Sequence, residues 1–164
     1  MKRLKLYPKK ILCLASFLII LDQLTKLIAK YLLKSKSIVI LPGLINYNLV
    51  YNYGASFGIL NNQAILLSII SFIVSVVLTI VVIKNSLLSS FRKLSLIFLL
   101  AGTIGNGIDR WFFGYVTDFI QLVPISFPVF NLADIYINIA IIIIFFEYIL
   151  SYLSARKIIN KNEN

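Results

Sequence analysis

The segment from Ala64 to Ile83 contains 20 consecutive residues without a charged side chain. A helix of about 20 apolar residues is long enough to cross the hydrocarbon core of a bilayer. The whole chain of 164 residues is 60% hydrophobic, and its mean hydropathy is +0.94. These features predict a membrane protein and argue against an ordinary water-soluble domain.

Three other apolar runs accompany this segment. We expect one membrane domain over residues 1–164, with four transmembrane helices at about 11–29, 64–83, 92–110 and 129–150. Alternation of polar and apolar residues in "INYNLVYN" indicates an outer ribbon over residues 38–61, and residues 111–128 are expected to form an outer loop. The predicted fold class is an all-α integral membrane protein with a small periplasmic β-ribbon or cradle between the first two helices.

The basic residues predict how these helices are oriented. Eleven of the 16 Lys and Arg residues fall in the N-terminal arm, the loop after the second helix and the C-terminal tail, and only four fall in the opposite loops. Because cytoplasmic loops carry the excess of positive charge, both termini are expected in the cytoplasm. This distribution explains the net charge of +10 without a nucleic-acid partner, and none is expected.

The first helix could instead be a removable signal peptide, because a basic arm precedes its apolar run. Asp22 and Lys26 interrupt that run, and no small-x-small cleavage site follows them. A retained helix is therefore favoured.

The chain has only four aspartates, and the predicted orientation brings all of them to one level. Asp22 lies toward the outer end of the first helix, Asp109 ends the third, Asp118 is in the outer loop and Asp134 begins the fourth. An ionisable residue inside a bilayer costs about 2.5–3.5 kcal/mol on insertion scales and usually has a function. We therefore expect a polar site near the outer surface.

Asp118 and Asp134 have no basic neighbour in the sequence. Two carboxylates at one depth among apolar side chains would share a single proton, because desolvation and like charge raise the pKa of one of them. One could then deprotonate water while the other, protonated, polarises a carbonyl group. This pattern indicates peptide hydrolysis without a metal ion or a nucleophilic serine.

The other two aspartates have simpler interpretations. Asp22 is four residues from Lys26, which is the spacing of an ion pair along a helix, so a structural pair stays open. Asp109 is expected to pair with Arg110 or other neighbours, in a structural or substrate-contacting role. The small residues of "AGTIGNG" are expected to let another helix approach closely.

Further polar residues have spacings that indicate a shared helix face and a turn. Asn131, Asp134 and Asn138 fall on one stripe of the fourth helix. Asn52 followed by Gly54 fits a turn that carries an amide toward the site, although a surface hairpin without a chemical role is an open alternative. The sequence has no histidine and one cysteine, so a Cys/His zinc site is excluded and no metal or cofactor is expected.

Five motifs occur in a fixed order along the chain. They are "DQLTK" at 22–26, "NYGASFG" at 52–58, "GNGIDR" at 105–110, "VTDF" at 116–119 and "FNLAD" at 130–134. In these motifs the chain resembles the bacterial lipoprotein signal peptidases, also called signal peptidase II or prolipoprotein signal peptidase. Any one motif alone would be a weak match, but the five together cover about residues 11–150.

This resemblance implies an aspartic endopeptidase of the bacterial cytoplasmic (inner) membrane, with its active site near the periplasmic face. It would remove signal peptides from diacylglyceryl-modified prolipoproteins by cleaving before the lipidated cysteine. The resemblance further implies contact with membrane lipid, blocking by globomycin-type inhibitors and no cofactor, and we expect a monomer. Asp118 and Asp134 match the catalytic pair. The residues expected to bind substrate or support the site are Asp22, Lys26, Asn52, Gly54, Asn106, Asp109, Arg110 and Asn131.

Three residues depart from the family pattern. Gly107 stands where a larger apolar residue is usual, Ser56 often reads as Ala, and Tyr136 replaces something smaller. None of them removes a carboxylate, so activity is still expected, but the shape of the pocket is in question.

Two other functions are weighed against peptide hydrolysis. A small proton-coupled transporter would also use buried carboxylates, but it needs polar groups through the full depth of the membrane. A non-catalytic membrane adaptor would use the basic arm and the outer ribbon, but it gives no reason for two unpaired carboxylates at one depth.

Overall fold

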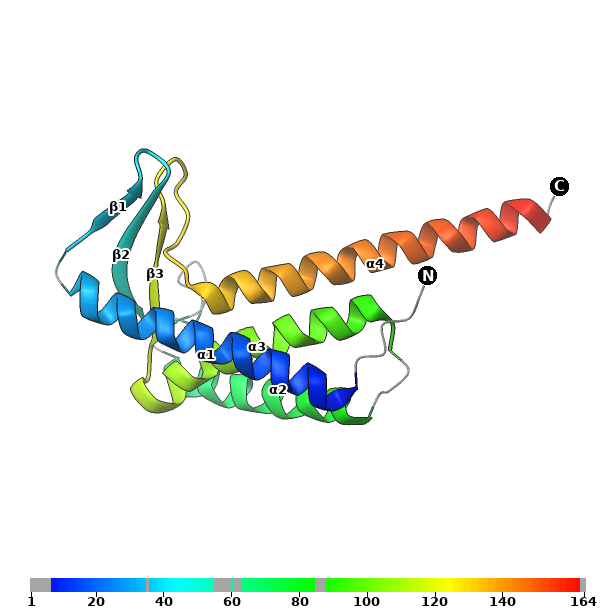
Figure 1. The fold of residues 1–164 in the computed structure, drawn as a ribbon, viewed down its shortest axis with the longest axis horizontal. Coiled ribbons are helices and arrows are strands. Elements are labelled where there is room, and N and C mark those ends of the chain that lie inside the picture. Colours follow the sequence, from blue (N-terminus) through cyan, green and yellow to red (C-terminus); the bar gives the residue numbers. More distant parts are fainter. Residues whose placement is uncertain (1–6, 35, 55–59, 61–62, 85–87, 163–164) are drawn as a thin grey trace.

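The computed structural model describes residues 7–34, 36–54, 60, 63–84 and 88–162. The described chain folds into four long helices and a three-stranded antiparallel sheet (Figure 1). The helices are α1 (Pro8–Leu33), α2 (Ala64–Lys84), α3 (Ser90–Phe113) and α4 (Leu132–Asn162). The strands are β1 (Ile38–Leu41), β2 (Ile45–Asn52) and β3 (Val116–Leu122), in the spatial order β1-β2-β3.

Three of the described helices are long and apolar enough to cross a membrane, namely α1, α2 and α4 over Leu132–Ser154. Helix α3 forms where the third crossing was predicted, but it is not among the three. Its C-terminal half carries glycines together with Asn106 and Asp109, which lower its hydropathy. The protein is therefore mostly helical and of membrane type, while the fourth crossing stays a prediction.

Helix α2 shows how hydroxyl groups are accommodated in such an apolar segment. Ser68, Ser75 and Thr79 each donate a hydrogen bond to the backbone carbonyl four residues earlier, over 2.7, 2.7 and 2.8 Å. No partner outside the helix is needed for these hydroxyls, so the helix can face lipid.

Close packing of α3 against its neighbours depends on two glycines. A Cβ atom at Gly102 would lie 2.5 Å from the carbonyl oxygen of Ala133 on α4, and one at Gly105 would lie 2.7 Å from Oδ2 of Asp22 on α1. The expectation that small residues allow close helix approach is confirmed for these two. At Gly107 the Cβ would instead meet the Trp111 ring of the same helix.

The predicted outer loop at 111–128 is wrong over residues 116–122, which form β3 and pair with β2. The small sheet therefore has three strands and includes a segment outside the predicted ribbon. The pattern was hard to read because Val116 to Phe119 are all buried, so apolar and polar residues do not sort onto an inner and an outer face. The predicted ribbon at 38–61 is confirmed at β1 and β2, while residues 55–59 and 61–62 lie outside the described residues.

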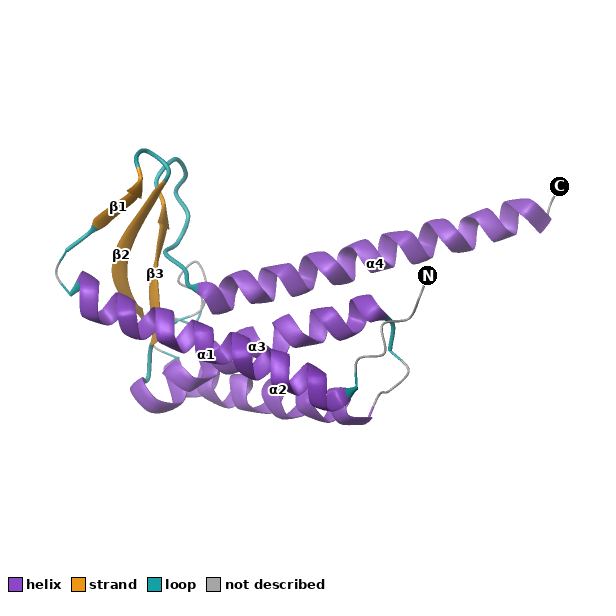
Figure 2. Ribbon diagram, viewed as in Figure 1, coloured by secondary structure: helices purple, strands orange, loops and turns teal. Residues whose placement is uncertain are grey.

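The sheet lies at the end of the helices where α1 and α3 end and α4 begins (Figure 2). Phe119 of β3 packs against Ala29 and Leu33 of α1, and its ring lies 5.5 Å from that of Tyr47 in an edge-on arrangement. Successive strand residues point to opposite faces, so this contact directs the adjacent Asp118 away from α1.

Two helix ends near the sheet have clear local causes. Helix α3 ends at Phe113 because Gly114 adopts a left-handed conformation, φ +76°, and donates its N–H to the Arg110 carbonyl over 3.1 Å. Helix α4 begins at Leu132 rather than near 129, since Asn131 caps it. It continues well past the predicted residue 150 and extends beyond the other helices at its C-terminal end (Figure 1).

Candidate active site

Asp118 is buried in β3, with 2% of its surface exposed. Its Oδ2 accepts a hydrogen bond from the side-chain amide of Asn52 over 3.0 Å, and its Oδ1 accepts one from that of Asn131 over 2.6 Å. Asn52 ends the neighbouring strand β2, so pairing of the two strands brings this amide to the carboxylate.

Asp134 is the third residue of α4 and completes a capping box with Asn131. The Asn131 Oδ1 accepts from the Asp134 backbone N–H over 3.0 Å, and the Asp134 Oδ2 accepts from the Asn131 backbone N–H over 3.2 Å. This reciprocal pair satisfies two N–H groups at the start of a helix and fixes the rotamer of the aspartate. The other carboxylate oxygen accepts from the Asn106 amide over 2.8 Å.

Asn131 therefore binds both aspartates that the sequence singled out. Its side chain donates to Asp118, and its backbone donates to Asp134. The residue is completely buried. The structure thus brings the two carboxylates together, as predicted, from a strand and from the first turn of a helix.

Burial and the nearby negative charge of Asp134 raise the pKa of Asp118 to about 7. The N–H donors of Asn52 and Asn131 and the positive charge of Lys26 act in the opposite direction, because they stabilise the ionised carboxylate. At neutral pH the carboxyl group of Asp118 is therefore able to carry a proton.

Lys26 of α1 is a buried cation near Asp118 and Asp134, with 1% of its surface exposed. Its ammonium group forms an ion pair with Asp22 at 2.9 Å and lies 3.6 Å from Asp109. It also donates to the Asn106 Oδ1 over 2.9 Å and to the Gly105 carbonyl over 3.3 Å. The predicted pairing of Asp22 with Lys26 is confirmed, and Asp109 pairs with Lys26 rather than with Arg110.

These donors determine which way the two asparagine amides point. An ammonium group and a backbone N–H can only donate hydrogen bonds. The Asn106 atom that faces Lys26 must therefore be its oxygen, which turns its NH2 group toward Asp134. The same reasoning at Asn131 turns its NH2 group toward Asp118.

Asp22 and Asp109 also hold the backbone next to each carboxylate of the pair. The Asp22 Oδ1 accepts from the N–H of Ala133 over 2.9 Å, one residue before Asp134. The Asp109 Oδ2 accepts from the N–H of Thr117 over 2.8 Å, one residue before Asp118. These two aspartates therefore have a supporting role in the geometry of the site.

Arg110 binds a backbone carbonyl group rather than the neighbouring Asp109. Its guanidinium group donates to the Gly54 carbonyl over 3.2 Å, and the Gly54 N–H donates to the Asn52 Oδ1 over 2.9 Å. The predicted turn at Asn52 and Gly54 is thus confirmed, and Arg110 binds its backbone. Ser56 and the rest of the "ASFG" segment lie outside the described residues.

A cavity of about 330 Å³ opens at the paired aspartates. Its lining is part polar and part apolar, which suits an extended peptide with apolar side chains. The polar lining consists of Asn52, Asn106, Arg110, Asp118, Asp134 and Asn138, and the apolar lining of Val116, Leu122, Phe127, Pro128, Val129, Phe130 and Ile135. Sequence reasoning placed Asn138 on the stripe of Asp134 but gave it no role, and it missed the apolar wall.

Gly107 and Tyr136, which depart from the family pattern and belong to the described residues, do not line this cavity. Trp111 covers Gly107 and donates its indole N–H to the Ser68 carbonyl over 3.0 Å. Tyr136 is buried, and its ring lies 6.0 Å from that of Phe98 on α3. Within the described ranges, no group of three or more acidic or cysteine side chains could hold a metal ion.

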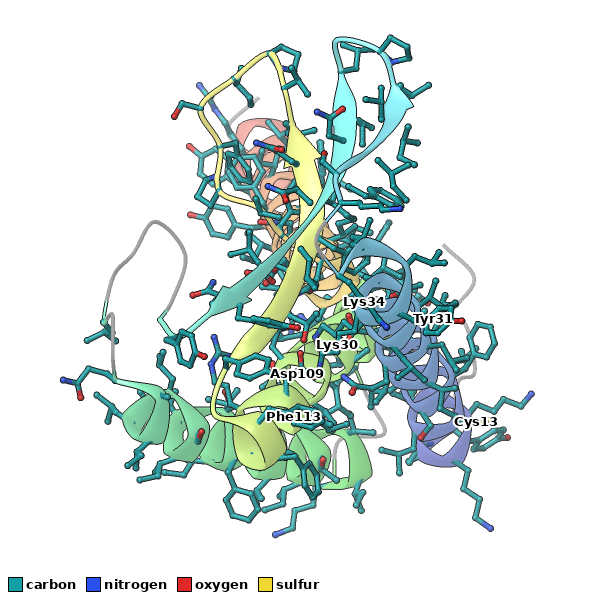
Figure 3. All side chains as sticks on the ribbon, turned by 90° about the vertical axis from the view of Figure 1, so that its left-hand side faces the viewer. Cys13, Lys30, Tyr31, Lys34, Asp109 and Phe113 are labelled. Atoms are coloured by element: carbon teal, nitrogen blue, oxygen red, sulfur yellow. The ribbon has the colours of Figure 1, made fainter. Side chains whose placement is uncertain are left out.

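Aromatic and basic residues gather at the same end of the molecule. Lys30 of α1 places its ammonium group 4.0 Å from the ring centre of Phe113 and 5.4 Å from that of Tyr115. Tyr31 and Lys34 lie on the same end of α1 (Figure 3). Such residues are typical of the boundary between membrane and water.

Comparison with known proteins gives a consistent result. Residues 14–150 match the family described as Signal peptidase (SPase) II. A lipoprotein signal peptidase of Parasynechococcus marenigrum (strain WH8102) is 44% identical over 133 residues, which cover 80% of this chain and 84% of the relative. One of Synechococcus sp. (strain RCC307) is 44% identical over 141 residues, covering 85% of this chain and 93% of the relative.

The fold is also similar to solved structures. One, described as a bacterial membrane enzyme, has a TM-score of 0.80 and 30% identity, and the match covers 93% of this chain and 94% of that one. A second, described in the same words, has a TM-score of 0.78 and 32% identity, covering 90% and 97%.

Proposed function

Because the chain belongs to the lipoprotein signal peptidase (signal peptidase II) family, we propose that it removes the signal peptide from diacylglyceryl-modified prolipoproteins by cleaving before the lipidated cysteine. The chain is thus a peptidase of that family, and Asp118 and Asp134 are proposed as its catalytic pair. The observation that carries this assignment is the convergence of the two carboxylates on one buried asparagine at the cavity.

The proposed mechanism needs one proton shared between the two aspartates. One carboxylate takes a proton from water as the water oxygen attacks the scissile carbonyl carbon, and the protonated partner donates to the carbonyl oxygen. The resulting gem-diol collapses as the carbon–nitrogen bond breaks. The departing nitrogen takes up a proton from the pair, and one hydroxyl group of the gem-diol returns a proton to the pair as the new carbonyl forms. A pKa of about 7 at Asp118 supports this scheme, since it keeps a proton available at neutral pH.

The substrate position follows from the position of the site. The cavity lies at the end of the molecule where α4 begins, the same end that carries Lys30 of α1 and Phe113 of α3. Acyl chains of a lipidated substrate can stay in the bilayer while its scissile bond reaches the aspartates from the side. We place the enzyme in the bacterial cytoplasmic (inner) membrane, with both termini in the cytoplasm and the active site near the periplasmic face. Globomycin-type peptides are proposed to block the same site.

The direct test uses purified protein in detergent and a synthetic lipopeptide with a diacylglyceryl cysteine. We expect cleavage on the N-terminal side of that cysteine, and no cleavage of the same peptide without its lipid. Asp118→Asn and Asp134→Asn should each lower turnover at least 1,000-fold, an estimate of about 4 kcal/mol of lost transition-state stabilisation.

The matched control is Asn48→Leu, which changes a β2 residue outside the cavity lining. It should keep near-normal turnover. If either aspartate variant, shown to be folded, also cleaves at near-normal rates, the assignment of the catalytic pair is wrong.

A further inference from the structure

Asn138 is a polar residue of the cavity that the proposed mechanism does not use. It lies on α4 one turn beyond Asp134, is exposed, and lines the cavity. Its side-chain nitrogen donates to the Asp134 backbone carbonyl over 3.0 Å. Within the described part of the chain, its Oδ1 accepts no hydrogen bond.

An exposed asparagine is costly at this position. The neighbours along α4 are Ile135, Ile137 and Ile139, within a helix apolar enough to cross a membrane. A polar group without a partner in an apolar environment loses free energy, so such residues usually face a partner or a binding site. The bond to the Asp134 carbonyl satisfies one N–H of the amide and leaves its other N–H and its oxygen available to a group bound in the cavity that Asn138 lines.

The backbone of the proposed substrate has N–H and C=O groups that need hydrogen-bond partners such as the Asn138 amide. The following inference rests on that proposed function. A signal peptide crosses the apolar region as a helix, but the peptide bond to be cut must leave the helix so that water and both aspartates can reach it. Unwinding the end of a helix frees backbone N–H and C=O groups, which cannot be left unpaired at the edge of a bilayer. A side-chain amide offers one acceptor and a donor to such a backbone.

The spacing on α4 indicates which part of the substrate Asn138 meets. Four helical residues advance about 6 Å from Asp134, and an extended peptide advances about 3.3 Å per residue. The separation from the scissile bond is therefore about two residues. It lies on the signal-peptide side, because α4 runs from the proposed periplasmic face into the membrane.

We propose that Asn138 is a substrate-contacting residue whose side-chain amide binds the signal-peptide backbone about two residues before the scissile bond. Because Asn138 would bind main-chain groups, the site could accept signal peptides with different side chains, provided that the backbone just before the scissile bond is extended. The apolar wall around Leu122 and Phe127 is left to receive those side chains.

The test combines backbone-modified substrates with variants of Asn138. Three lipopeptides carry a single N-methyl group, one, two or three residues before the scissile bond, and an unmethylated peptide is the reference. With the wild-type enzyme, one of these methyl groups should lower kcat/KM about tenfold, the equivalent of one hydrogen bond of about 1.4 kcal/mol. Asn138→Leu should lower kcat/KM for the reference peptide by a similar factor.

The decisive comparison is between the loss of kcat/KM that the methyl group causes in the wild-type enzyme and the loss that it causes in the Asn138 variants. If Asn138 binds that N–H, the methyl group causes no further loss in Asn138→Leu, nor in Asn138→Ala, which leaves the cavity open. Full independent losses in both variants would overturn the inference. Normal cleavage of the reference peptide by both variants would also overturn it while leaving the peptidase function intact. Failure of the wild-type enzyme to cleave the reference peptide would instead contradict the proposed function.

Discussion

At the scale of single residues, the site is a set of carboxylates whose environments differ although their chemistry is the same. Asp22 and Asp109 share a buried ammonium group, whereas Asp118 receives N–H donors from neutral amides. Burial and the charge of Asp134 outweigh these donors and raise the pKa of Asp118 to about 7, so this carboxyl group can take up and release a proton near neutral pH.

The dependence of activity on pH should report this environment. As pH rises above about 7, Asp118 loses its proton, the pair becomes doubly ionised and turnover should fall. Asn52→Leu removes an N–H donor that stabilises the ionised form, so it should raise the pKa and move the alkaline limb of the kcat profile upward by about one pH unit. Asn48→Leu is the control on the same strand. A limb that stays in place or moves to lower pH in Asn52→Leu would contradict this explanation.

Lys26 should matter for stability as well as for activity. Lys26→Met leaves Asp22 and Asp109 buried without a cation, and breaking such a pair costs about 3–5 kcal/mol. We expect a large drop in thermal stability in detergent. The drop should be smaller in the double variant Asp22→Asn/Lys26→Met, because it removes one of the two buried carboxylates that would lack a cation. Wild-type stability in Lys26→Met would mean that the ion pairs hold little of the structure together.

At the scale of helices and strands, the apolar helices could be predicted from the sequence. The strand and the helix start that depend on contacts with other residues could not. The apolar run of α2 and the interrupted runs of α1 and α4 located three helices within a few residues, except that α4 continues to Asn162. Strand β3 was missed because it is buried on both faces and needs β2 beside it to be a strand at all. The start of α4 was placed early since the capping role of Asn131 depends on a bond to Asp134 that no periodicity reveals.

The approach of α3 to α4 gives a prediction at this scale. Gly102→Ala places a methyl group against the backbone carbonyl of Ala133, which cannot move without shifting the start of α4 and with it Asp134. Overpacking of this kind costs about 1–3 kcal/mol, and turnover should fall together with thermal stability.

Gly107→Ala is the matched control, because the atoms that it meets belong to the Trp111 side chain of the same helix and not to the backbone of α4. It should leave turnover closer to that of the wild type. Equal losses in the two variants would mean that the distance between α3 and α4 does not determine the geometry of the site.

At the scale of the whole molecule, the candidate site could be predicted more completely than the fold. Asp22, Asp109, Asp118 and Asp134 were expected at one level from the orientation of the helices, and they do lie together. Apart from the Asp22–Lys26 pair, their partners could not be derived, since contacts such as that of Asn131 with Asp118 join different elements of the fold. The apolar wall was missed because no feature of residues 122–130 distinguishes a cavity lining from a loop.

The proposed orientation can be tested with single cysteines, because Cys13 is the only native one. In a Cys13→Ser background, Ile125→Cys near the sheet should react with a maleimide that cannot cross the membrane when intact spheroplasts are labelled. Asn160→Cys in the C-terminal tail should react only after the membrane is broken. Labelling of Asn160→Cys in intact spheroplasts would reverse the orientation.

The ammonium group of Lys26 has a further consequence for the time at which the enzyme becomes active. It comes from the first helix, while the carboxylates that it aligns hold the backbone beside Asp118 and Asp134, near the end of the chain. A ribosome must therefore deliver nearly all of the polypeptide before the cation and both aspartates can meet. A nascent chain that lacks the start of α4 cannot assemble the proposed catalytic pair, so peptidase activity should appear only after α4 has joined the other elements.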